Sequence, residues 1–164
     1  MRKVFGETMN TSGRQEGNAV FSTYPIRSHD NTEYKVKSAS YESALQVAVD
    51  AGLSDAMIVS TRLPEKALNR DLTSCVQTII GIRRSIGDGP FIVAGNLPRP
   101  TEIEKLEKFA EVRGTHGKAE GRSQPSVLWY VDGDAINLID ARSVETPFGS
   151  LTIAQFGLFN KALR

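Results

Sequence analysis

The sequence predicts an α/β domain, with a mixed β-sheet, a central βαβ crossover, flanking hairpins and three to four helices. Two short and wholly apolar segments, 56–59 and 91–94, are typical of central strands that are covered on both faces. The segment between them has apolar residues at three- and four-residue spacing, as an amphipathic helix does. Such a strand–helix–strand unit makes the two strands parallel neighbours.

The bulk composition is that of one folded domain. The chain has 164 residues, 40% of them hydrophobic and 24% charged, which is enough for a hydrophobic core and ordinary for a globular protein. Residues 1–18 are polar and rich in Gly, Asn, Ser and Thr, so we expect an N-terminal arm there. The single α/β domain is expected to occupy residues 19–164.

The N-terminal part of this domain is expected to hold a hairpin and a helix. Segments 19–26 and 33–39 are rich in aromatic, β-branched or alternating residues, and a polar turn separates them. A helix is expected over 41–51, with Ser40 as its N-cap and Gly52 as its stop.

The longest helix is expected over about 64–86. Pro64 suits its first turn, and Gly87 follows its end. Cys75 lies on the apolar stripe of this helix, which indicates a buried structural thiol rather than a reactive one. The residues of the stripe are Leu68, Leu72, Cys75, Val76, Ile79, Ile82 and Ile86.

The C-terminal part is expected to contain two further helices around a second hairpin. A capping box at Thr101 and Glu104 opens a helix that closes at Gly114, and a polar loop follows. Segments 126–131 and 135–140 read as strands joined by a tight turn at Asp132 and Gly133. The tail from residue 152 is expected to be helical.

The best-placed candidate site follows the two apolar strands. In open α/β sheets, ligands bind beyond the carboxyl ends of parallel strands, where the N–H groups of helix N-termini favour anions. Two arginines there would suit a phosphate or a carboxylate. The alternative is that these residues only make turns and helix caps. The candidate ligand-binding residues are Ser60, Thr61, Arg62, Gly95, Asn96 and Arg99.

Asp132 and Asp134 are candidate metal ligands. Two carboxylates one residue apart at a strand end suit a divalent ion such as Mg²⁺ shared with a phosphate. The alternative is that Asp-Gly serves only the tight turn of a hairpin. Mg²⁺ is the one candidate cofactor. The two histidines, 87 positions apart, make no zinc pattern.

The C-terminal aromatic residues Phe148, Phe156 and Phe159 are a candidate interface. They place much apolar surface at one end of the chain. If this segment folds back it is ordinary core, and if it does not, it is a patch for a protein partner.

Charge, cysteine content and hydropathy exclude several classes of protein. The 20 basic and 19 acidic residues give a net charge of +1, which argues against nonspecific nucleic-acid binding. One cysteine cannot form an internal disulfide, and no segment has the roughly 20 apolar residues that span a bilayer. A cytoplasmic protein is the expectation.

Two functions fit these observations. The first is a non-catalytic binding or assembly protein that self-associates or docks on a larger partner, because no motif specifies a catalytic constellation. The second is a small enzyme or ligand-binding domain for an anionic metabolite or nucleotide that bears phosphate or carboxylate. It would use Arg62 and Arg99, with Mg²⁺ at Asp132 and Asp134. The sequence favours the first hypothesis, a non-catalytic protein, and leaves open whether the protein is an enzyme.

Overall fold

The computed structural model describes residues 1–35, 42–52, 54–63, 69–96, 112–116, 126–131, 135–147 and 149–159. The predicted helix at 101–113 and the link at 132–134 therefore lie largely outside these residues. The elements run β1 (Arg2–Thr11), β2 (Arg14–Ser22), β3 (Ile26–Glu33), β4 (Ser43–Asp50), β5 (Asp55–Arg62), α1 (Asn69–Ser85), β6 (Phe91–Asn96), β7 (Val112–His116), β8 (Ser126–Val131), β9 (Ile136–Thr146) and β10 (Gly149–Leu158).

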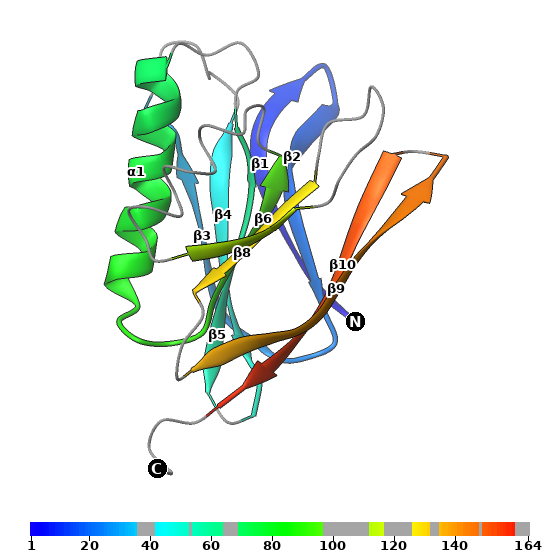
Figure 1. Cartoon of the computed structure of the whole chain (residues 1–164). Helices are drawn as coiled ribbons and strands as arrows, with labels where there is room; N and C mark the ends of the chain where they lie inside the picture. The colour runs from blue at the N-terminus through cyan, green and yellow to red at the C-terminus, as the bar shows by residue number, and fades with distance from the viewer. Residues whose placement is uncertain are drawn as a thin grey trace.

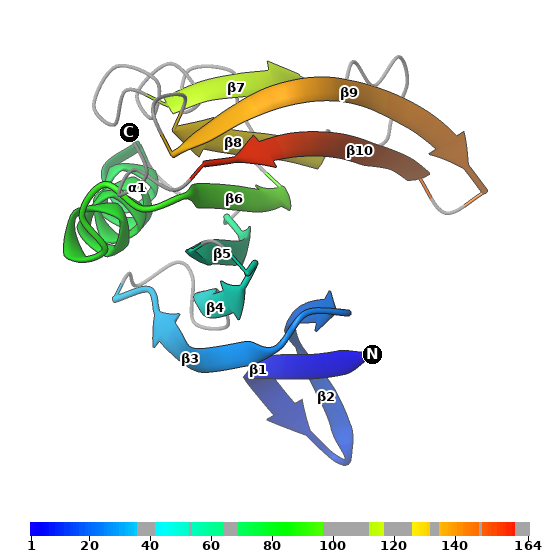
Figure 2. The same ribbon diagram turned by 90° about the horizontal axis from the view of Figure 1, so that it is seen from below.

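A six-stranded sheet in the order β3-β4-β5-β6-β8-β7 forms the centre of the molecule. Strands β5 and β6 are parallel, and the other neighbours in this sheet are antiparallel. Helix α1 covers one face of the sheet (Figure 1). The hairpins β1–β2 and β9–β10 lie on the opposite face, the first beside β3 and β4 and the second beside β8 (Figure 2).

The predicted βαβ unit is confirmed. Strands β5 and β6 flank α1 in sequence and pair in parallel from Met57–Phe91 to Arg62–Asn96. The helix buries its apolar stripe against the sheet, and Cys75 within it is fully buried as predicted. The core on this face consists of Tyr34, Ala44, Val59, Leu63, Leu72, Cys75, Val76, Ile79, Ile80, Ile82, Phe91 and Val93.

The N-terminal residues form a strand hairpin where the sequence suggested a polar arm. A two-residue turn at Ser12 and Gly13 joins β1 to β2, and both residues have positive φ, at 52° and 83°. This is the geometry that two-residue hairpin turns favour. Val4 and Val20 pair across the hairpin and pack on β4. The extent of the single domain itself stays a prediction.

The helix predicted over 41–51 is wrong, because residues 43–50 form β4. Leu45, Val47 and Val49 alternate along this strand and are buried beneath β1–β2. The intervening residues face the helix side of the sheet, where Ala44 joins the core. A strand covered on both faces carries apolar residues at nearly every position, so it resembles a short buried helix in sequence. The predicted strand over 33–39 meets β3 only at Glu33, since Tyr34 and Lys35 are not in a strand, and residues 36–39 lie outside the described residues.

The C-terminal predictions were partly wrong. The tail from residue 152, expected to be helical, lies in β10 (Gly149–Leu158) as far as Leu158, and this strand pairs antiparallel with β9. Strand β8 pairs with β6 and β7, so the predicted hairpin of 126–131 with 135–140 does not form. Residues 112–116, expected at a helix end and in a loop, form β7. Within the described residues there is therefore one helix, not three to four, and none that is long and apolar enough to cross a membrane.

Candidate functional site

The carboxyl ends of β5 and β6 bring together five of the six predicted ligand-binding residues. Ser60, Thr61 and Arg62 close β5, while Gly95 and Asn96 close β6. Thr61 pairs with Gly95, and Arg62 pairs with Asn96, in the parallel ladder. These residues belong to the strands themselves rather than to the loops after them. Arg99 lies outside the described residues.

Gly95 allows a close approach of the two strand ends. A Cβ atom at this position would collide with the backbone carbonyl oxygen of Thr61, and it would lie 2.9 Å from the Thr61 Cγ2 atom. A backbone carbonyl within a sheet cannot move aside without disturbing the ladder. The tight fit of Gly95 against Thr61 therefore sets the spacing of β5 and β6 at this edge.

The three residues that close β5 differ in what they can contact. Arg62 is exposed, Ser60 is half-buried, and the side chain of Thr61 is only 3% exposed. Arg62 can therefore reach a ligand at the sheet edge, whereas Thr61 has its hydroxyl in the interior. Thr61 was predicted as a ligand-binding residue, but its buried hydroxyl can contact only other residues of the protein.

The Thr61 hydroxyl belongs to a buried hydrogen-bond network that the sequence did not reveal. It donates to the carbonyl oxygen of Ser43 at 3.0 Å. It is also hydrogen-bonded to the hydroxyl of Tyr34, which is 4% exposed. The same Ser43 carbonyl accepts a bond from Asn18 at 2.9 Å, and the Ser43 hydroxyl donates to Asn31 at 2.7 Å. The network therefore extends from Thr61 in β5, next to Arg62, to Asn18 in the hairpin β1–β2.

The Tyr34 hydroxyl and the Cys75 thiol both have raised pKa values. Burial is the main cause that raises the pKa of Tyr34 well above its usual value, although the hydrogen bond with Thr61 partly offsets it. Burial, followed by the negative charges of Glu42 and Asp71, raises the pKa of Cys75 to about 12. At neutral pH the thiol is therefore protonated and a poor nucleophile.

The described residues do not supply a metal site. They contain no group of three or more His, Cys, Asp or Glu side chains arranged to hold an ion. The predicted ligands Asp132 and Asp134 lie outside the described residues. Tyr130 pairs with Ile92, so β8 ends at the edge of the sheet where β6 begins, away from Gly95. The five described residues that close β5 and β6 carry no carboxylate, the ligand that Mg²⁺ prefers, and a metal site at Asp132 and Asp134 stays a prediction.

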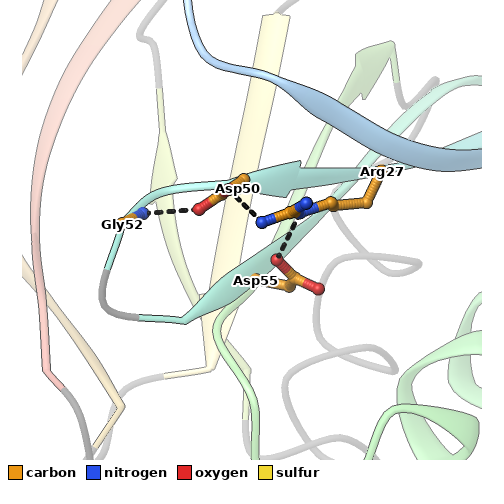
Figure 3. A network of polar contacts seen from close by, with 4 residues as sticks. All are labelled: Arg27, Asp50, Gly52 and Asp55. Carbon is orange, nitrogen blue, oxygen red and sulfur yellow. Dashed lines mark hydrogen bonds and ion pairs between the residues drawn. The ribbon is translucent and has the colours of Figure 1, made fainter.

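The polar cluster at the opposite edge of the sheet is structural (Figure 3). Arg27 forms an ion pair with Asp50, and its Nε atom lies 3.9 Å from Asp55 Oδ1. Asp50 also accepts a hydrogen bond from the Gly52 amide at 2.9 Å. These contacts tie the β4–β5 turn to β3. Asp55 opens β5 and Arg62 closes it, so the two ends are ~23 Å apart at the usual rise of a strand.

Two of the three residues of the predicted aromatic interface, Phe156 and Phe159, lie in the described part of the chain. Phe156 is half-buried within β10, and Phe159 just after it is 38% exposed. Phe159 donates its backbone amide to the carbonyl of Ala135 at 3.0 Å, so it is attached to the start of β9. Phe148 lies outside the described residues. An interface at these three residues stays a prediction.

Comparison with solved structures relates this arrangement to known folds. The catalytic domain of human Nocturnin with a bound sulfate anion matches at 18% identity and a TM-score of 0.67, over 96% of this chain and 72% of that one. An endonuclease/exonuclease/phosphatase from Bacteroides vulgatus matches at 10% identity and a TM-score of 0.74, over 96% and 76%. The chain shares the fold of these structures.

A third structure with this fold contains a metal. A double mutant of beta toxin from Staphylococcus aureus with bound magnesium ions matches at 10% identity and a TM-score of 0.61, over 93% of this chain and 73% of that one. No protein-family model matches the sequence, and no curated protein matches it.

These neighbours overturn the function that the sequence favoured. We expected a non-catalytic binding or assembly protein that self-associates or docks on a protein partner. The solved structures that share the fold include endonuclease/exonuclease/phosphatase proteins and a catalytic domain. The sequence was misleading because a site at the carboxyl ends of parallel strands is formed by residues that lie far apart in the chain. Such a site carries no contiguous motif. The alternative, an enzyme or binding domain for an anionic ligand, agrees better with the fold.

Proposed function

We propose that this chain binds phosphate esters at the carboxyl ends of β5 and β6 and hydrolyses them. In the reaction, a water oxygen attacks phosphorus, the ester P–O bond breaks, and a proton of the water passes to the leaving oxygen to give an alcohol. The observation that carries this proposal is the exposed Arg62 beside the tightly packed Gly95, at the edge of a fold shared with endonuclease/exonuclease/phosphatase structures.

Arg62 is the anion-binding residue of the proposal. A guanidinium group presents a fork of N–H donors that matches two oxygens of a phosphate, and such charge-assisted bonds are stronger than neutral ones. The sulfate in the Nocturnin structure has the tetrahedral shape of phosphate and is also an anion, which supports an anionic ligand. Arg99, predicted from the sequence as a second cation, would add to Arg62 in this proposal.

The described residues account for binding rather than for activation of the water. The residues that close β5 and β6, Ser60 to Arg62 with Gly95 and Asn96, include no carboxylate and no histidine that could activate the water. Asp132 and Asp134 stay predicted metal ligands, and the magnesium ions in the beta toxin neighbour are the reason to test divalent cations. The cytoplasmic location stays a prediction.

The test is hydrolysis of bis(p-nitrophenyl) phosphate with and without Mg²⁺ or Mn²⁺. We expect release of p-nitrophenol in proportion to the amount of protein. Arg62→Ala should lower kcat/KM by roughly 10- to 100-fold, the effect of losing one charge-assisted hydrogen bond. Arg27→Ala is the matched control. Arg27 lies in β3 close to Asp55, at the opposite end of β5 from Arg62, so its loss removes the same charge and should leave kcat/KM unchanged.

Two results would contradict the proposed function. One is no release above the buffer rate by the native protein under any of the three cation conditions. The other is an equal loss in Arg62→Ala and Arg27→Ala, which would mean that the position of the arginine does not matter.

A further inference from the structure

The direction of every hydrogen bond around Thr61 follows from the donors that are available. The threonine hydroxyl has a single proton, which it donates to the Ser43 carbonyl at 3.0 Å. The bond between the Tyr34 and Thr61 hydroxyls must therefore be donated by Tyr34. The raised pKa of Tyr34 keeps its proton in place at any ordinary pH. Tyr34 thus donates to Thr61, and Thr61 donates to Ser43.

The three central residues of this network, Tyr34, Ser43 and Thr61, are shielded from water. Tyr34, Ser43 and Thr61 are 4%, 0% and 3% exposed. The Ser43 carbonyl accepts from Thr61 and from Asn18, so both of its acceptor sites are used. A buried network in which each partner is satisfied holds its members in one arrangement. Removal of one hydroxyl leaves a buried partner unpaired.

The network fixes the strand end that carries Arg62. Thr61 has its side chain bonded to Ser43 of β4 and to Tyr34, while its carbonyl oxygen contacts Gly95 of β6. Thr61 and Arg62 are consecutive residues of β5, joined by one peptide bond. Rotation of the Thr61 side chain would break the two hydroxyl bonds, so the network restrains Thr61 and, through it, the adjacent backbone of Arg62.

We propose that Tyr34 and Thr61 are positioning residues, which align Arg62 for phosphate without touching the ligand. This inference rests on the proposed function, since it assumes that Arg62 binds phosphate. Tyr34 lies 28 positions before Arg62 in the sequence, and no motif connects them. The Tyr34 hydroxyl acts only through Thr61.

The test is a titration of the full chain with inorganic phosphate, followed by amide NMR at a temperature well below unfolding. Tyr34→Phe and Thr61→Val should each raise the Kd for phosphate by about five- to tenfold, the effect of one lost buried hydrogen bond on an aligned contact. Thr61→Ser keeps the hydroxyl and should stay within about twofold of the native Kd. The double variant should be no weaker than Thr61→Val alone, because the two residues act as one unit.

A matched variant separates positioning from stability. Val49→Ala removes buried apolar volume from β4 at the opposite end of the sheet, so it should lower Tm but leave the Kd unchanged. If Val49→Ala weakens phosphate binding as much as Tyr34→Phe does, the effect is one of stability and the inference is wrong.

The remaining outcomes distinguish the inference from the proposed function. If Arg62→Ala abolishes phosphate binding while Tyr34→Phe and Thr61→Val bind like the native protein, the positioning role is wrong and the proposed function stands. If the native protein does not bind phosphate, or Arg62→Ala binds like the native protein, the proposed function fails and the inference fails with it.

Discussion

Gly95→Ala is expected to destabilise the protein by about 3 kcal/mol, at the upper end of the cost of overpacking. The added methyl group would meet the carbonyl oxygen of Thr61, which is held in the β5–β6 ladder and cannot turn away. The strands must separate at the edge where Arg62 lies. Chemical denaturation should show a lower midpoint, and phosphate binding should weaken in the same variant.

Gly81→Ala is the control for this substitution. Gly81 lies within α1, and a Cβ atom there would meet nothing within 4 Å. Alanine favours the helix over glycine, so this variant should gain about 0.5–1 kcal/mol of stability. A Gly95→Ala protein as stable as the native one would mean that the close approach of β5 and β6 at Thr61 does not exist.

Leu45→Ala is expected to cost about 2–5 kcal/mol, the usual range for a buried leucine. Leu45 of β4 is completely buried beneath the β1–β2 hairpin, where it packs with Val4 and Val20. The loss would show that residues 1–22 form a packed layer of the protein. The measurement is the free energy of unfolding from urea denaturation.

Leu45→Met keeps nearly the same volume and should cost less than about 1.5 kcal/mol. If Leu45→Ala unfolds at the same urea concentration as the native protein, the hairpin does not cover β4. Residues 1–18 would then be the polar arm that their composition suggested.

The sequence was sufficient for the central βαβ unit because its signals are local. The stripe of α1 repeats at the helical period over 17 residues, and each flanking strand is a short apolar run. These signals also located the strand ends that carry Arg62 and Gly95, although not the contact of Gly95 with Thr61. That contact depends on the spacing of two strands, which no single segment encodes.

The hairpins were harder to predict because their signals depend on the partner layer. Strand β1 buries Val4 among polar residues, so its composition alone resembles a loop. Strand β4 is covered on both faces, so its apolar pattern has no clear period. The role of Tyr34 was not visible for the same reason: its partner Thr61 is 27 positions away.

The central claim is that phosphate binds where β5 and β6 end, and the most direct measurement is the location of amide shifts during a titration with inorganic phosphate. We expect the largest changes at residues 60–63 and 95–96, with little change at residues 50–55 around Arg27. Changes that cluster at residues 50–55 instead, or that spread evenly over the surface, would contradict a site at Arg62.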